Sequence, residues 1–508
     1  MNDRLQALLE DFSRLDSYEP AMRVKAQRRT AWVGEFTTPE VIEYLQALQQ
    51  IAVPVTATQE EWLKAGFVQV SKKVQAASRP KSPADVIAPV DQESLSKLAD
   101  ALYRYLGPKS HSRGQLLEIL ATLGREEDLK RLVQHLVDDP PEEDTDVVQA
   151  LSPLFQKKDV PWQVIFPAIW PALQHLSLAA SILDLANFTQ AKKLLPQHPA
   201  SDKQAELIQL LSLLTGRLAS LERPANAESL SATELSKQIS QSVALGVSLC
   251  HTLAMLNAKD AIGKLYQFME LGHRRLKTEA AAALARLGEK AGVEALVSLA
   301  AQPVARLRAL AYAEELKVLD QVPAEHKTKF ARAEGALTVW LSEPTQYGLP
   351  PQHCELIDER TQFWPGYSSP VDCFLLRFTY VVTIEGEGER SFSNIGIAGP
   401  LTYAFTADLA DLPPDDIYAT YAGWQTEHEE IREYEVARLN RSGKIEVARL
   451  ERRLHDSGLE EIRPELFGNF FGEKTLVARA ERQGLEGIAV VGADDILFVP
   501  TRGARRAL

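Results

Sequence analysis

Leu253-Ala254-Met255-Leu256-Asn257-Ala258-Lys259 returns 31 residues later as Leu284-Ala285-Arg286-Leu287-Gly288-Glu289-Lys290. Leu276 and Leu307 are separated by the same interval. A fixed period of this length indicates stacked supersecondary units, none of which can bury its apolar face alone. The stretch therefore predicts a helical repeat array.

A third copy of the pattern lies upstream, where Ile119–Glu126 matches Ala283–Lys290. The small residues Ala121 and Ala285 would allow helices to approach closely. Gly124 and Gly288 would take the left-handed conformation that ends the first helix of each pair. These matches predict a mainly α fold, an α-solenoid followed by a smaller mixed α/β module with β-hairpins.

Four segments follow from this pattern and from changes in composition. We expect an N-terminal helical extension over 1–77, a linker over 78–91, degenerate helical repeats over 92–343 and an α/β module over 344–508.

Strands of the α/β module are predicted where aromatic and β-branched residues gather. Cys373–Ile384 and Ser391–Ile397 should form one hairpin, and Gly487–Val491 and Ile496–Val499 a second. Between them, Trp424–Leu454 predicts a charged helical section.

Composition limits the function. The chain has 508 residues, a formal net charge of −13 and three cysteines. An acidic chain of this kind is not expected to bind nucleic acid, and so few, scattered cysteines predict no disulfide framework or thiolate zinc site. With no basic-then-apolar start and no long apolar run, we expect a cytoplasmic protein without a membrane segment.

The repeats resemble the HEAT family, especially the short repeats of phycobilisome-lyase-like proteins. The resemblance is carried by Arg275–Gly288 and by Leu120–Gly124. It implies a stacked-helix scaffold and leaves the function open, since one fold hosts many roles. The family's deoxyhypusine hydroxylase places His-Glu dipeptides on successive repeats, whereas here the one His-Glu, His428-Glu429, lies outside them. We therefore expect no di-iron site, and no cofactor.

Aromatic residues concentrate in the C-terminal module. Trp, Tyr and Arg dominate the energetics of protein interfaces, so a recognition surface is one interpretation. The alternative is that these residues fill the core of a small module. The candidate contact residues are Arg360, Trp364, Tyr367, Tyr421 and Trp424.

Two sequence patterns could indicate a metal site or a nucleophilic cysteine. Glu427, His428 and Glu430 could contribute to a metal site with remote ligands, but position 432 is Arg, so the two-histidine zincin motif is missing and a solvated acidic helix start is the favoured interpretation. Cys354 follows His353, yet adjacent side chains diverge, and a nucleophile's base usually comes from elsewhere in the chain.

The sequence thus favours a non-catalytic scaffold that binds a protein partner of unknown identity. The alternative is an enzyme or a small-molecule or metal-binding protein, lyase-like, with a pocket where the solenoid meets the module and with Glu427, His428, Glu430 and Cys354 lining it.

Overall fold

The computed structural model describes residues 3–51, 54–78, 86–157, 159–222, 231–384, 388–428, 432–436, 439, 441–470, 473–482, 484–492 and 496–500. The chain forms two compact units. The first comprises residues 1–301 and 308–323, and the second comprises 302–307 and 324–508.

The first unit is helical. Its α-helices are α1 (Asp3–Arg14), α2 (Pro20–Arg29), α3 (Thr38–Leu48), α4 (Ala57–Ser78), α5 (Pro89–Leu106), α6 (Arg113–Leu123), α7 (Glu126–Asp138), α8 (Asp144–Leu151), α9 (Trp162–Ile169), α10 (Leu176–Ala191), α11 (Gln204–Leu221), α13 (Ala232–Met255), α14 (Ile262–Met269), α15 (Arg274–Arg286), α16 (Lys290–Ala300) and α17 (Pro303–Glu315). Short 3-10 turns, such as η4 (Ser152–Gln156), connect several of them.

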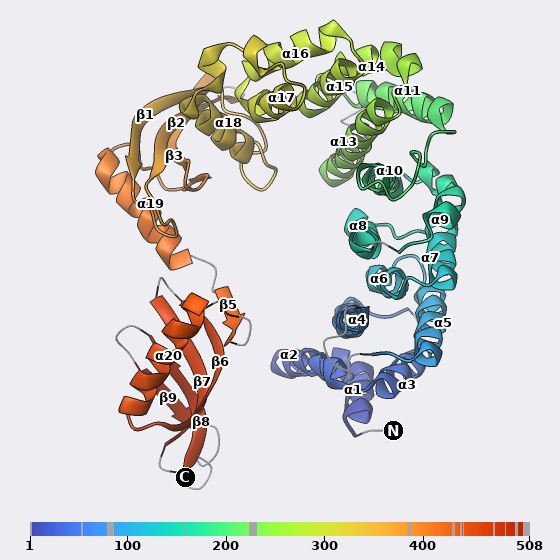
Figure 1. Cartoon of the computed structure of the whole chain (residues 1–508), viewed down its shortest axis with the longest axis vertical. Coiled ribbons are helices and arrows are strands. Elements are labelled where there is room, and N and C mark those ends of the chain that lie inside the picture. The colour runs from blue at the N-terminus through green and yellow to red at the C-terminus, as the bar shows by residue number, and fades with distance from the viewer. Residues whose placement is uncertain are drawn as a thin grey trace. The chain divides into compact units, whose positions relative to one another are not determined.

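These helices are packed in series. Along one row, α4 contacts α6, α6 contacts α8, α8 contacts α10, α10 contacts α13 and α13 contacts α15. A second row flanks the first, with α3 against α5, α7 against α9 and α11 against α14 (Figure 1). Contacts such as α5 with α6 and α14 with α15 join the rows. The structure confirms the predicted helical array, in which each helix meets mainly its neighbours.

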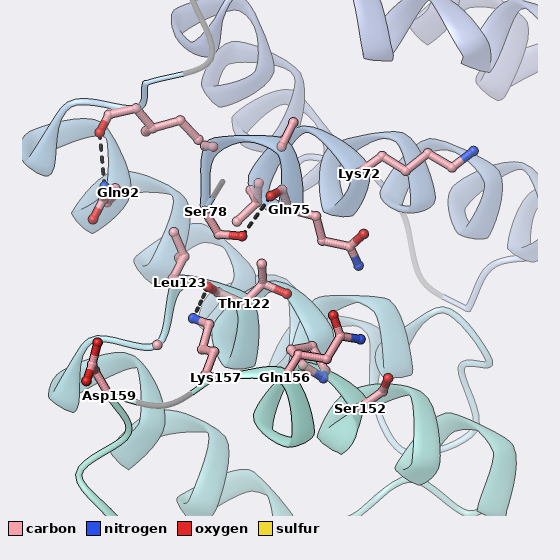
Figure 2. A pocket seen from close by; sticks show the side chains of 16 residues that line it. Lys72, Gln75, Ser78, Gln92, Thr122, Leu123, Ser152, Gln156, Lys157 and Asp159 are labelled. Carbon is pink, nitrogen blue, oxygen red and sulfur yellow. Dashed lines mark hydrogen bonds between the residues drawn. The ribbon is translucent and has the colours of Figure 1, made fainter. Parts of the chain in front are cut away.

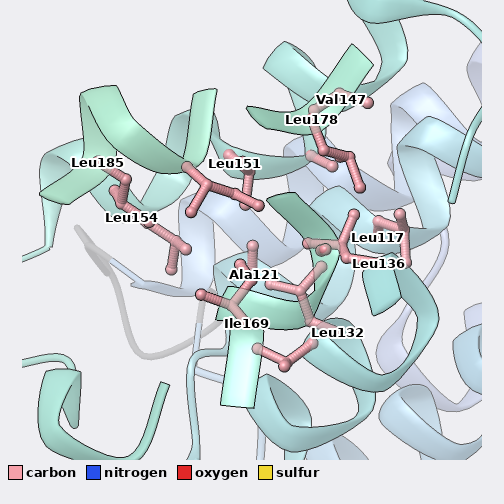
Figure 3. Close-up of a cluster of buried hydrophobic side chains, with 14 of the residues drawn as sticks. Leu117, Ala121, Leu132, Leu136, Val147, Leu151, Leu154, Ile169, Leu178 and Leu185 are labelled. Carbon is pink, nitrogen blue, oxygen red and sulfur yellow. The ribbon is translucent and has the colours of Figure 1, made fainter. Parts of the chain in front are cut away.

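One hydrophobic core runs between the two rows, from Leu5 to Leu287. Figure 3 shows part of it, where leucines of α6, α7, α8 and α10 interdigitate. Residues of the predicted N-terminal extension belong to the same core, including Phe12 and Trp62, whose rings lie 5.2 Å apart. The predicted linker, 78–91, includes residues 79–85, which lie outside the described residues, while Pro89–Asp91 already begin α5.

The repeated sequence is a repeated helix end. Gly288 adopts φ +92°, its N–H donates to the carbonyl of Ala285 (3.0 Å), and the next N–H, of Glu289, donates to Leu284 (2.9 Å). This pair of bonds is the Schellman motif, which satisfies carbonyls left over at a helix C-terminus.

The same pair of bonds ends three other helices. At the end of α13, Asn257 replaces the glycine at φ +51°, and the N–H of Ala258 donates to Leu253 (3.0 Å). Lys193 after α10 and Lys317 after α17 have the same role at φ +55° and +59°. The 31-residue recurrence therefore corresponds to a left-handed cap that ends successive helices. The left-handed cap predicted at Gly288 is confirmed.

Two substitutions at these caps should have opposite effects on stability. Gly288→Ala places a Cβ in left-handed backbone and should lower the free energy of unfolding by about 1 kcal/mol, although no atom clashes with it. Lys317→Gly removes a Cβ from left-handed backbone and should raise the free energy of unfolding by about 0.5–1 kcal/mol. Denaturant unfolding of both variants checks this, and a shift of the same sign in both would contradict the shared cap.

The second unit takes the first residues of α17 (303–307) and continues with α18 (Lys329–Leu341), so it begins upstream of the predicted boundary at 344. An antiparallel sheet follows in the order β1-β2-β3-β4, formed by β1 (His353–Gln362), β2 (Val371–Ile384), β3 (Gly388–Ala398) and β4 (Tyr403–Ala404). One face of β2 and β3 packs on α18 through Leu337 and Phe378, and the other packs on α19 (Pro414–His428) through Leu375 and Tyr421. The predicted first hairpin is β2–β3, and it is confirmed.

A second antiparallel sheet has the order β5-β6-β7-β8-β9, with β5 (Arg432–Glu435), β6 (Glu460–Phe470), β7 (Glu473–Arg482), β8 (Leu485–Val491) and β9 (Ile496–Pro500). Helix α20 (Arg441–Asp456) covers one face of it. The predicted second hairpin, β8–β9, is confirmed. The predicted charged helical section is wrong in one respect, because β5 lies between α19 and α20.

Candidate functional site

The five predicted contact residues lie on two elements of the second unit and the connection between them. Arg360 is on β1, Trp364 and Tyr367 follow β1, and Tyr421 and Trp424 are on α19. Since α19 packs on the first sheet, the fold brings the two groups together.

Two of the five are core residues. Trp364 is 3% exposed, donates its indole N–H to Gln425 (2.6 Å) and meets the ring of Tyr418 edge-on. Tyr421 has no exposed surface, donates its hydroxyl to the carbonyl of Ile395 (2.8 Å) and belongs to the same cluster. This corrects their predicted role, because a partner could reach neither ring unless α19 separated from the sheet.

Arg360 is engaged within the unit. Its guanidinium donates to Asp358 (2.6 Å) and to Asp415 on α19 (2.5 Å), and it lies over the ring of Tyr418, 4.5 Å from the centroid. These bonds join β1 to the start of α19, so Arg360 fixes the helix on the sheet.

Exposed aromatic surface remains beside this cluster. Tyr367 is 45% exposed and donates its hydroxyl to the carbonyl of Pro400 (2.7 Å). Trp424 is half-buried and stacks on Tyr403 with the ring centroids 4.2 Å apart. Phe363, which the sequence interpretation did not single out, is 75% exposed. The aromatic surface that a partner could touch is thus centred on Phe363 and Tyr367.

The alternative metal ligands cannot be placed. Helix α19 ends at His428, and the side chains of Glu427 and His428, together with Glu430, lie outside the described residues. Within the described residues, no group of three His, Cys, Asp or Glu side chains could hold a metal ion.

Cys354 is a packed thiol. It lies against the cluster of α18 and β2, with its Sγ 3.8 Å from the hydroxyl of Thr338, while His353 is exposed. Burial raises the pKa of Cys354 to about 11. A nucleophilic cysteine needs the opposite shift, because the thiolate is the reactive form.

Alkylation should therefore be slow at Cys354. With a pKa near 11, we expect iodoacetamide at pH 8 to modify it roughly 100-fold more slowly than an ordinary thiol, with the rate rising tenfold per pH unit up to about pH 10. Mass spectrometry of the Cys354 peptide, with the denatured chain as control, measures this. Rapid modification of the folded protein at pH 8 would contradict the assignment.

A pocket of about 690 Å³ lies in the first unit, where the C-terminal parts of α4 and α6 meet η4 (Figure 2). The residues lining it include Lys72, Gln75, Ser78, Gln92, Thr122, Ser152, Gln156, Lys157 and Asp159. Its size falls in the range of ligand and peptide-side-chain sites, and its lining is largely polar.

A hydrogen-bonded bridge of glutamines and a glutamate lies beside the pocket. Gln75 of α4 donates to one carboxylate oxygen of Glu118 (2.7 Å), and Gln149 of α8 donates to the other (2.8 Å). Glu118 itself is buried on α6. Three successive helices of the first row are thus joined across one carboxylate, which fixes their register.

Hydrogen-bonding capacity in the pocket is left unused. Among the described residues, none pairs with the buried hydroxyl of Thr122 or with the side-chain amide of Gln156. In Figure 2 the side chains of Gln75, Thr122 and Gln156 point into the same space. Lys157 donates to the carbonyl of Thr122, and burial lowers the pKa of that lysine. The pocket therefore offers both donors and acceptors.

A sequence signal for this site exists in α6. Glu118 interrupts the run Leu116–Leu120 and Gln115 precedes it, and polar residues at buried positions of a helix indicate a hydrogen-bonded network. The partners on α4 and α8 are far away in sequence, so only the fold reveals the pocket.

Comparisons with known proteins do not assign the chain to a family. No family model, no curated protein and no solved structure matches the chain. Across the part of the chain that the structure describes, no helix is long and apolar enough to cross a membrane.

Proposed function

We propose that this protein is a non-catalytic scaffold of the HEAT-repeat type that binds a segment of a partner protein. Support comes from the serial packing of the first-row helices and from the cap that recurs at the ends of α10, α13, α15 and α17. Repeat arrays of this kind expose side chains of successive helices along one surface, which suits extended partners.

The proposed contact site is the pocket between α4, α6 and η4. Side-chain amides carry two N–H donors and one carbonyl acceptor, the same groups that an extended peptide backbone presents. Gln75, already fixed by Glu118, keeps its carbonyl oxygen as an acceptor, and Gln156 on η4 offers a whole amide. An extended peptide lying between them would pair with both and could satisfy the hydroxyl of Thr122.

The observation that carries the proposal is the buried hydroxyl of Thr122, which lies in the wall of a polar pocket and has no hydrogen-bond partner within the part of the chain that the structure describes. A buried polar group without a partner costs about 1–3 kcal/mol, and a bound polar segment would remove that cost. Phe363 and Tyr367 of the second unit form a second proposed contact surface, since exposed aromatic side chains are favoured at interfaces.

Site-specific photo-crosslinking in the native host tests the proposal. A photoreactive amino acid at position 156 should form an adduct with a partner protein. The same amino acid at position 134 is the control, since Gln134 is exposed on α7 and lies outside the pocket. An adduct at 156 that Gln75→Ala reduces at least roughly tenfold supports the proposal. Equal labelling at both positions, or none at 156, would refute it.

The alternative function, an enzyme or metal-binding protein, receives no support from Cys354. Its thiol is packed among apolar side chains and its raised pKa keeps it protonated near neutral pH.

A further inference from the structure

Strand β9 is an edge strand. Within the described residues it pairs with β8 alone, in a register that places Val499 opposite Ile488 and Leu497 opposite Val490. Its last residue, Pro500, has no N–H to donate, and prolines in sheets are found at edges. The outer side of β9 therefore presents a row of backbone groups that a further strand could use.

Within Ile496–Pro500, no side chain of this edge strand is charged. The sequence Ile496-Leu497-Phe498-Val499 contains only apolar residues, and Leu497 and Val499 are 59% and 49% exposed. At the other edge of the same sheet, β5 reads Arg432-Glu433-Tyr434-Glu435. Natural proteins use such charges to prevent pairing of an edge. An edge strand without such charges is open to pairing with another strand.

An apolar band runs across β6, β7 and β8 to reach this edge. Cross-strand pairing places Leu466 beside Val477, Val477 beside Val490, and Val490 beside Leu497. Because side chains alternate along a strand, this band lies on the face away from α20, which packs on Leu476, Ala478 and Ala489.

We propose that two copies of this chain pair antiparallel through β9, joining their five-stranded sheets into one. The register that overlaps all of Ile496–Pro500 places Phe498 opposite its own symmetry mate and Leu497 of each copy beside Val499 of the other. Each apolar band then continues into the other copy.

A second copy fits this edge on charge and symmetry. The chain has a net charge of −13, so two copies repel on average, and β9, which carries no charge, is a segment through which they can meet. A two-fold contact needs a strand that complements itself, and the alternation of apolar residues in β9 meets that need without any change.

The mass of the full chain in solution is the first test. Light scattering behind size exclusion, over about 1–100 µM, should give twice the mass of one chain. Leu497→Lys should restore the single mass, because it adds a charge to the edge and, at an exposed position, leaves folding intact. Leu485→Lys is the matched control: Leu485 is 41% exposed on the same sheet, and β9 does not pair with it, so that variant should stay dimeric.

Disulfide trapping tests the register. Mixing the variants Leu497→Cys and Val499→Cys should give a crosslinked pair, whereas neither variant should crosslink alone to the same extent. A single-chain mass at all concentrations would overturn the proposal. A dimer that Leu497→Lys leaves intact, or one that Leu485→Lys disrupts equally, would also overturn it.

Discussion

Gly292→Ala is expected to lower the free energy of unfolding of the first unit by about 3 kcal/mol. A Cβ on Gly292 would lie 2.4 Å from the backbone nitrogen of Ala285 and 2.6 Å from the carbonyl oxygen of Ala281. Both atoms belong to the backbone of α15, so α16 would have to move away from it. Denaturant unfolding followed by circular dichroism measures the change.

Gly263→Ala is the matched control for this prediction. Gly263 is in α14, and a Cβ there meets nothing within 4 Å. Alanine is the better helix former, so this variant should be more stable by about 0.5–1 kcal/mol. If both variants lost stability equally, close approach of α15 and α16 would not be the cause.

Trp364→Ala is expected to destabilise the second unit by about 3–5 kcal/mol, because it removes a buried indole from the cluster between the first sheet and α19. The neighbouring variant Phe363→Ala removes a ring that is 75% exposed and should change stability by no more than about 0.5 kcal/mol. Hydrogen exchange of β2 and β3 in both variants reports the effect.

The two substitutions also separate folding from binding. If Trp364 were a contact residue, its removal would weaken partner capture and leave exchange in β2 and β3 unchanged. That result would contradict the burial described above. Loss of capture with Phe363→Ala and unchanged exchange would instead place the contact on the exposed ring.

The repeat and the hairpins could be predicted because their determinants are local. Left-handed caps favour Gly and Asn, which Gly288 and Asn257 supply, whereas the caps at Lys193 and Lys317 carry no such sequence signal. Strands β2 and β8 are dense in β-branched and aromatic residues. Strands β1, β6 and β7 escaped prediction, since charged residues occupy their exposed positions. In β7, for example, Arg479 alternates with the buried Ala478 and Ala480.

Whether a candidate residue can contact a partner depends on its burial, and the amino-acid sequence did not predict burial. Trp364 and Phe363 are adjacent aromatic residues, yet one is buried under α19 and the other is exposed. The pocket could not be predicted from the sequence either, because Gln75, Thr122 and Gln156 come from three elements that only tertiary packing brings together. Sequence patterns predicted the helical array and the two hairpins, and tertiary packing decides which side chains are available to a partner.

Hydrogen exchange of Gly292→Ala compared with the unmodified protein tests the serial packing of the helices most directly. In a serial array each helix depends on its neighbours, so protection should fall in α15, α16 and the adjoining α13 and α14. The amides of α3 to α7 should keep their protection. A uniform loss from α3 to α16 would show a single cooperative body and would contradict the array.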